Sequence, residues 1–369
     1  MNKLFTIIIL LFISNTSVFA SETKGVITTI QPINALVNAV IGNTGGSTSL
    51  IPSDVSPHEF KLKPSDVKNL QDGNIIFYIS SHLESSVTKV FKNLPKNIKI
   101  INLMEETGIN HLAIRDNEAW ERHDHHDDHD KDAKKDDDHN DHDKHAKKDD
   151  DHDDHDKHAK KDDDHDDHDK HAKKDDNHDD HDDHDKHAKK DDNHDDHEKE
   201  DDVHIWLDPD NGIKIIQKVN KELSLLFPEN SQIYNKNATN IINKITELKS
   251  ELKEELLSIK DKPYIVFHDA YQYFEKVFGL NAVGSIALED DVASSPKQIS
   301  FIRNKIIKSS VSCVFQEPQF NSKLVKTVVE GTDAKVGTLD PLGVDISNNK
   351  DFYLQLLRNM SKSLKKCLG

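Results

Sequence analysis

Short runs of β-branched and aliphatic residues alternate along this chain with longer segments whose apolar positions recur at helical spacing. Four runs in the first part have the length and composition of buried strands. They are Val26–Ile30, Thr48–Ile51, Ile75–Ile79 and Ile98–Asn102. Three helices are predicted between or after them: one that begins near Pro32, then Pro64–Gln71 and Leu83–Asn93.

The same alternation returns in the last third of the chain. The strands predicted there are Tyr264–Phe267, Ala282–Ile286, Cys313–Gln316 and Ala334–Thr338. The helices predicted there are Ala270–Phe278, Pro296–Ser309, Ser322–Gly331 and Asp351–Lys366. Alternating strands and helices form parallel sheets covered by helices. We therefore expect an α/β fold of two βα lobes, each with a mostly parallel four-stranded sheet.

Two long helical patterns separate these halves. The first is Pro209–Phe227, and the second, Glu229–Lys260, has isoleucine and leucine at helical spacing and contains no proline or glycine. A helix of about 30 residues is about 45 Å long, enough to run along two lobes. We therefore predict one long rigid helix at 228–260, between an N-terminal lobe at 21–227 and a C-terminal lobe at 261–369.

A low-complexity insert interrupts the N-terminal lobe at about residues 117–202. It has almost no apolar residues beyond alanine, so we predict that this His/Asp-rich insert is disordered. It repeats the unit HAKKDDDHDDHDK and holds 19 of the 24 histidines. Between Glu121 and Asp202 there are 38 acidic and 17 basic side chains, a net charge of −21. The whole chain has a net charge of −19, so the rest of it has a net charge of +2. No basic patch with interleaved aromatics occurs, and we expect no nucleic-acid partner.

The N-terminus has the pattern of a secretory signal peptide. Lys3 precedes an apolar run, Leu4–Ile13, and Val18 and Ala20 supply small residues at the −3 and −1 positions of a cleavage site. We predict a signal peptide at 1–20, cleaved after Ala20, the alternative being a buried N-terminal helix. Ser21 offers no cysteine for a lipid anchor, and no second long apolar run follows. We therefore expect a soluble, monomeric protein of the periplasm.

Cysteine usage agrees with export. The chain has two cysteines, Cys313 and Cys367. A lone pair in an oxidising compartment usually forms a disulfide. The alternatives are two buried thiols or half of a metal site, but the separation is far wider than in a zinc knuckle. The pattern favours the disulfide.

Three of the five histidines outside the insert stand where a ligand site is expected. His58 follows the second predicted strand, His204 follows the insert, and His268 ends the first strand of the C-terminal lobe. Ligands of open α/β sheets bind beyond the carboxyl ends of strands. Three imidazoles suit Zn²⁺, whereas Ca²⁺ and Mg²⁺ prefer oxygen. A single histidine beside a strand is more often structural, and we expect that role, or surface exposure, for His82 and His111.

Five stretches resemble the zinc-uptake ABC transporter periplasmic binding proteins, within the metal-specific cluster of bacterial solute-binding proteins. They are PHEFKLKPSD (57–66), HIWLDP (204–209), FHDAYQYFE (267–275), CVFQEPQF (313–320) and GTLDPLG (337–343). They span nearly the whole mature chain outside the insert. The resemblance implies a protein that is not an enzyme, that binds Zn²⁺ in a cleft between two lobes, and that delivers it to an inner-membrane ABC permease and its ATPase.

The resemblance also assigns individual residues. It implies that His58, His204 and His268 are metal ligands and that Cys313 pairs with Cys367. Manganese members of the cluster carry a carboxylate at the position of His268, so the histidine favours zinc.

The fourth ligand is left open by the sequence. Some zinc members place a glutamate immediately before the first histidine, but here that residue is Pro57. Glu59 directly follows the histidine. Asp340 matches a position that binds metal in manganese relatives, or it caps the loop after the last strand. The remaining alternatives for the fourth ligand are a water molecule and a histidine of the insert.

Other functions fit the sequence less well. A zinc hydrolase with three histidines would need a general base at a known spacing, and no HExxH motif is present. An adhesin or a metal-storage protein is the other alternative. For the insert, the repeated histidines among carboxylates favour collection, buffering or sensing of metal. The alternative is a solvated loop without a role.

Overall fold

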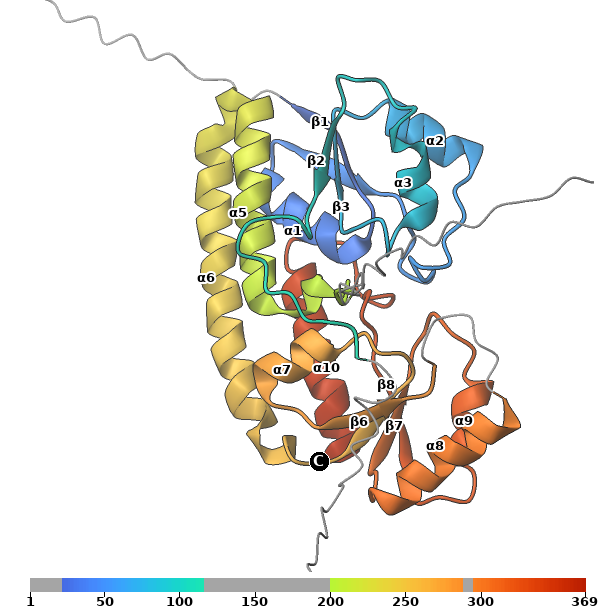
Figure 1. Ribbon diagram of the computed structural model, residues 1–369. Helices are drawn as coiled ribbons and strands as arrows, with labels where there is room; N and C mark the ends of the chain where they lie inside the picture. The colour runs from blue at the N-terminus through green and yellow to red at the C-terminus, as the bar shows by residue number, and fades with distance from the viewer. Residues whose placement is uncertain (1–21, 116–199, 288–294) are drawn as a thin grey trace, which may run out of the picture. The chain divides into compact units, whose positions relative to one another are not determined.

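The structure, a computed structural model, describes residues 22–115, 200–287 and 295–369 (Figure 1). The predicted signal peptide, with its cleavage site after Ala20, lies outside these residues, as does nearly all of the predicted insert. None of the helices within the described ranges has both the length and the apolar character needed to cross a membrane.

The N-terminal lobe is built on a sheet of four parallel strands in the order β2-β1-β3-β4. The strands are β1 (Thr23–Thr28), β2 (Gly45–Ser49), β3 (Ile75–Tyr78) and β4 (Lys99–Asn102). The helices of this part are α1 (Gln31–Ile41), α2 (Pro64–Gln71) and α3 (Ser85–Phe91). Prolines at the first turns of α1 and α2 give up backbone donors that would lack intrahelical partners there.

The C-terminal lobe repeats this strand order as β6-β5-β7-β8, again entirely parallel. Its strands are β5 (Tyr264–Val266), β6 (Ala282–Ser285), β7 (Cys313–Gln316) and β8 (Lys335–Thr338). Its helices are α7 (Gln272–Phe278), α8 (Pro296–Lys308), α9 (Lys323–Val329) and α10 (Phe352–Leu368). The predicted α/β fold with two four-stranded parallel sheets is confirmed.

Two long helices, α5 (Pro209–Leu226) and α6 (Ser231–Leu256), run side by side, and α6 continues along both lobes (Figure 1). The short 3₁₀ turns η2 (Pro228–Asn230) and η3 (Leu257–Ile259) precede and follow α6. Helix α6 packs against α1 and α5 on one lobe and against α7 and α10 on the other. Its 26 residues give a length of about 39 Å. The long helix that the apolar spacing predicts is therefore present.

Strand β2 lies earlier in the chain than predicted. It begins at Gly45 rather than Thr48, because its first residues are small and polar and form an exposed edge of the sheet. Leu50 and Ile51, which suggested the strand, are buried just beyond its end. The apolar pattern therefore marked the buried end of an edge strand instead of the strand itself.

The predicted insert, at about 117–202, overlaps the described structure at residues 200–202. Residues 200–203 pair with residues 112–115 through hydrogen bonds from the Ile114 amide to the Glu200 carbonyl (2.8 Å) and from the Asp202 amide to the Leu112 carbonyl (2.7 Å). We call these two short segments the stem. Only 4% of Asp202 is exposed. Its acidic neighbours made it indistinguishable from the low-complexity sequence before it.

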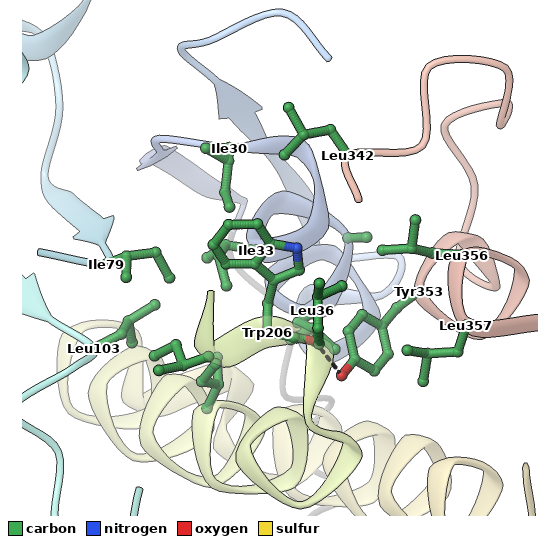
Figure 2. Close-up of a cluster of buried hydrophobic side chains, with 14 of the residues drawn as sticks. Ile30, Ile33, Leu36, Ile79, Leu103, Trp206, Leu342, Tyr353, Leu356 and Leu357 are labelled. Carbon is green, nitrogen blue, oxygen red and sulfur yellow. Dashed lines mark hydrogen bonds between the residues drawn. The ribbon is translucent and has the colours of Figure 1, made fainter. Parts of the chain in front are cut away.

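A continuous core joins the two lobes around Trp206, in the 3₁₀ turn η1 (Ile205–Leu207) (Figure 2). The indole nitrogen donates to the Pro341 carbonyl (2.9 Å), and the Tyr353 hydroxyl donates to the Trp206 carbonyl (2.8 Å). A Cβ atom at Gly212 would lie 2.5 Å from that hydroxyl, so glycine allows Tyr353 to reach the turn. This packing fixes η1 and the residue that starts it, His204.

The predicted disulfide is present. Cys313 at the start of β7 is bonded to Cys367 in α10, and both residues are buried. The bond links the sheet of the C-terminal lobe to the helix that also packs against α1 and α6.

Candidate metal site

The three histidines singled out by the sequence meet between the two lobes. His58 lies in the loop after β2, His204 immediately precedes η1, and His268 lies two residues after β5. The Nε2 atom of His204 is 3.4 Å from Nε2 of His58 and 3.3 Å from Nε2 of His268. Within the described residues they form the one group of three such side chains whose ligand atoms all lie within 4.8 Å of one another.

These separations match the edge of a zinc coordination tetrahedron. With Zn–N bonds of about 2.05 Å and tetrahedral angles, neighbouring ligand nitrogens are about 3.3 Å apart. The separations of 3.3 and 3.4 Å from His204 match this edge, and the ligand atoms of all three rings lie within 4.8 Å of one another, so the group is suited to one shared ion. Three neutral nitrogen donors also suit Zn²⁺ better than a hard cation.

Buried carboxylates orient two of the three rings. Asp202 Oδ1 lies 2.7 Å from Nδ1 of His204, and Glu317 Oε1 lies 2.7 Å from Nδ1 of His268. Both acidic residues are almost fully buried, with 4% and 3% exposed. A carboxylate accepts a hydrogen bond, so each Nδ1 carries the proton and each Nε2 keeps its lone pair for a metal.

Sequence reasoning missed both carboxylates. Asp202 was hidden in the acidic tract, and Glu317 lies within CVFQEPQF, where it was quoted but given no role. The available signal for Glu317 was its position immediately after β7, at the same sheet edge as His268.

The cavity between the rings is very small. Its volume is about 10 Å³, and its wall includes Trp206, Phe320 and Leu342 besides the histidines. Such a space accommodates about one water-sized particle. The site therefore suits a single ion rather than an organic ligand. His204 and His268 are buried, while His58 is the most exposed of the three.

Asp340 is engaged in its own loop. Its Oδ1 accepts hydrogen bonds from the backbone amides of Leu342 (3.0 Å) and Gly343 (2.8 Å) and from the side-chain amide of Gln319 (3.0 Å). Its Oδ2 accepts from the amide of Val344 at 2.6 Å. This geometry is that of a loop cap, the second of the two roles considered for it. Glu59, the other candidate fourth ligand, is exposed.

A buried ion cluster lies beside the site. Arg115 bonds Asp269, the neighbour of His268, through two nitrogens, and bonds Glu275 at 2.6 Å. Burial raises the pKa of Glu275 to about 7 although Arg115 lowers it. Burial also raises the pKa of Asp269, against the opposing effect of Arg115. The cluster thus depends on a single guanidinium to offset two desolvated carboxylates.

The remaining two histidines lie near the stem. The side chain of His82 is 64% exposed and lies 4.0 Å from Glu200. His111 pairs with Asp201, Nδ1 to Oδ2, at 2.8 Å. Neither belongs to the three-histidine group.

Comparison with known proteins identifies the family. The family model ZnuA, zinc-uptake complex component A, periplasmic, matches residues 26–367. The chain belongs to this family. It is 37% identical over 353 residues to the high-affinity zinc uptake system protein ZnuA of Brucella suis, covering 96% of this chain and 94% of that protein. The protein of the same name in Haemophilus ducreyi is 32% identical over 343 residues, covering 93% of each.

Solved structures share the fold. A crystal structure of ZnuA matches with a TM-score of 0.64 at 18% identity, covering 95% of this chain and 100% of that chain. The laminin-binding adhesin Lmb of Streptococcus agalactiae matches with a TM-score of 0.64 at 20% identity, covering 94% and 100%. At such identities the likeness shows the fold alone. Because the family consists of uptake components, its members, this chain included, are not enzymes.

Proposed function

We propose that this chain is a periplasmic binding protein that captures Zn²⁺ between its lobes and delivers it, as a monomer, to an inner-membrane ABC permease and its ATPase. The observation that carries the proposal is the spacing of the three Nε2 atoms, 3.3 and 3.4 Å, around a cavity for one ion. Family membership and the names of the relatives support zinc as the cargo.

In this proposal His58, His204 and His268 bind the ion, and two buried carboxylates hold two of the rings in place. The N-terminal lobe supplies His58 from the loop after β2, and the C-terminal lobe supplies His268. Release to the permease then requires the two lobes to give up shared ligands. The proposed division is an N-terminal lobe at 21–227, a linking helix region at 228–260 and a C-terminal lobe at 261–369.

The fourth coordination position is proposed to hold water. Asp340 already accepts four hydrogen bonds, three of them from backbone amides, which would be left unpaired if it turned toward a metal. Pro57 has no ligand atom in its side chain. A site completed by water also keeps one position exchangeable, which suits a protein that must pass its cargo on.

The insert is proposed to collect metal. Its histidines, three residues apart among aspartates, offer many weak sites for Zn²⁺ and similar ions. The signal peptide is proposed to direct export of the protein and to be cleaved after Ala20.

The experiment is a zinc titration of the metal-free mature chain, read in competition with a chelator so that weak sites stay empty. The wild type should bind one tight equivalent. His204→Ala should abolish it, and His82→Ala, which removes an exposed histidine outside the group, should not. In a zinc-starved bacterium lacking its own periplasmic zinc-binding protein, the same ranking should hold for growth. Equal affinity of His204→Ala and His82→Ala would refute the proposal.

A further inference from the structure

One segment crosses from the N-terminal lobe to the C-terminal lobe without regular structure. Residues 103–115 leave β4, follow α5 and end at α7 (Figure 1). On the way, Asn110 exchanges hydrogen bonds with Asn211 (2.7 and 3.1 Å) and donates to Asp208 (2.9 Å). The last four residues form one half of the stem.

The first two residues of helix α7 hold both halves of the stem. The Tyr273 hydroxyl accepts from the Leu112 amide at 3.2 Å and donates to the Asp202 carbonyl at 2.9 Å. The side-chain amide of Gln272 donates to the Ala113 carbonyl (3.1 Å) and to Asp202 Oδ2 (3.2 Å). These contacts link the stem to the C-terminal lobe at the level of the metal site.

Arg115 adds the charged contacts. Its Nε donates to Asp269 Oδ2 at 2.8 Å, its Nη2 pairs with the other oxygen of the same carboxylate, and its Nη1 donates to Glu275 Oε2 at 2.6 Å. The guanidinium is 18% exposed and the two carboxylates are 15% and 6% exposed. A planar fork is suited to this double contact, which an ammonium group cannot reproduce.

The stem carries the carboxylate that orients a metal ligand. Asp202 Oδ1 bonds both Nδ1 (2.7 Å) and the backbone amide (2.9 Å) of His204, and its other oxygen bonds Gln272. Asp269, held by Arg115, directly follows the ligand His268. Arg115 therefore bonds the residue that follows one ligand, and it belongs to the segment that pairs with the residue orienting another, without touching a ligand nitrogen.

We propose that Arg115 is a positioning residue for the metal site: it fastens the stem to the C-terminal lobe and so keeps Asp202 on His204 and Asp269 beside His268. The inference rests on the proposed function, because it concerns the same three-histidine site. Loss of outer partners of metal-bound histidines commonly weakens metal binding about 10- to 100-fold.

The test compares the full mature chain with Arg115→Met and Arg115→Lys, using Zn²⁺ in competition with a chelator. We expect about a tenfold higher zinc Kd for Arg115→Met. Lysine keeps the charge but bonds one carboxylate at a time, so the zinc Kd of Arg115→Lys should lie between those of the wild type and Arg115→Met. If Arg115→Met does not fold, the zinc Kd of Arg115→Lys decides the question.

Lys218→Met is the matched control. Lys218 also pairs with two carboxylates, Glu106 (2.5 Å) and Glu222 (3.3 Å), and is 17% exposed. Glu106 belongs to the same crossing segment, but none of the three residues touches the stem or the ligands in the described structure. This control should lose stability and keep the zinc Kd of the wild type.

A double-variant cycle shows whether Arg115 acts through Asp202. Adding Arg115→Met to Asp202→Asn should weaken zinc binding by much less than it does in the wild type. If the two substitutions have purely additive effects on the free energy of zinc binding, Arg115 does not act through Asp202, and the proposal is overturned.

Hydrogen exchange in the zinc-free chain provides a measurement that does not depend on zinc. Peptides that contain Ile114 and Asp202 should exchange faster in Arg115→Met and not in Lys218→Met, because their amides pair across the stem. Unchanged exchange, or a zinc Kd within about twofold of the wild type, would overturn the proposal. A wild type that binds no zinc would instead refute the proposed function, and the exchange result would still decide whether Arg115 holds the stem.

Discussion

The Nε2 atoms of His204 and His268 lie 3.3 Å apart although 64 residues separate them in the chain. Two different features of the fold bring these two atoms together. His204 is fixed by the core around Trp206, which includes residues of both lobes, and His268 is fixed at the end of β5. Each ring is then turned by a buried carboxylate, so the two lone pairs face the same small cavity.

Removal of His268 should have the largest effect on zinc affinity. In the described structure it is the histidine that the C-terminal lobe contributes to the three-histidine group. His268→Ala should raise the zinc Kd by at least about 100-fold, since one of the three proposed protein ligands is lost. Asp340→Asn is the informative comparison. It should change the Kd little, and a loss equal to that of His268→Ala would make Asp340 a ligand. Chelator competition measures both.

Loss of an orienting carboxylate should weaken zinc binding clearly, but less than loss of a histidine of the group. Asp202→Asn and Glu317→Gln place an amide where a carboxylate now faces an Nδ1 atom. Each should raise the zinc Kd about 10- to 100-fold, because the ring loses its fixed tautomer and some basicity. Zinc titrations of both variants, with Asp210→Asn as a surface control at the start of α5, measure this. Wild-type affinity in both variants would mean that the carboxylates serve only the fold.

Zinc affinity should fall in acid. The three ring nitrogens must be unprotonated to bind, so protons compete with the metal, and imidazole titrates at about pH 6.5 in water. Between about pH 7.5 and pH 5 the Kd should rise steeply, by more than tenfold. Titrations in a series of non-coordinating buffers would show it. A flat profile would contradict coordination dominated by histidine.

The strand–helix alternation, the parallel sheets and the long helix were all predictable, because each depends on local apolar periodicity. The three histidines could be proposed because each stands in a distinctive local sequence. Glu317 and Arg115 could not, since their roles arise from contacts with residues far away in sequence. Asp202 contacts His204, only two residues away, but its acidic neighbours hid it. The composition that identified the insert also concealed that Asp202 belongs to the fold. The outer support of a metal site is thus a tertiary property, even where its ligands have a sequence signature.

Glu84 should make the stability of the fold depend on pH. It is fully buried, and burial raises its pKa from 4.5 to about 7, although hydrogen bonds from Thr29 and the Ser80 amide lower it. The folded chain therefore keeps a proton that the unfolded chain has lost between about pH 4.5 and pH 7. Its contribution to stability is complete below that window and is lost as the pH rises through it.

Glu84→Gln removes this titration while keeping a similar shape. The unfolding free energy of the wild type relative to this variant should fall by about 3 kcal/mol between acid pH and pH 8. Urea denaturation of the zinc-free proteins at several pH values measures it. A difference that does not vary with pH would mean that the pKa of Glu84 is the same in the folded and unfolded chains.

Deletion of the insert should spare the fold and the three-histidine site, provided that the stem is kept. Residues 121–197 contain no apolar residues beyond alanine to add to a core, and shortening a surface loop changes closure entropy little. A chain lacking residues 121–197 retains Arg115, residues 200–203 and Asp202. It should keep one tight zinc equivalent and lose several weaker ones.

A longer deletion that also removes residues 200–202 is the matched comparison, and it should lose tight binding because His204 loses its carboxylate. Calorimetric titration of the full chain and both deletions separates these outcomes. Equal stoichiometry in the full chain and the shorter deletion would eliminate metal collection by the insert, and tight binding by the longer deletion would show that the stem is dispensable.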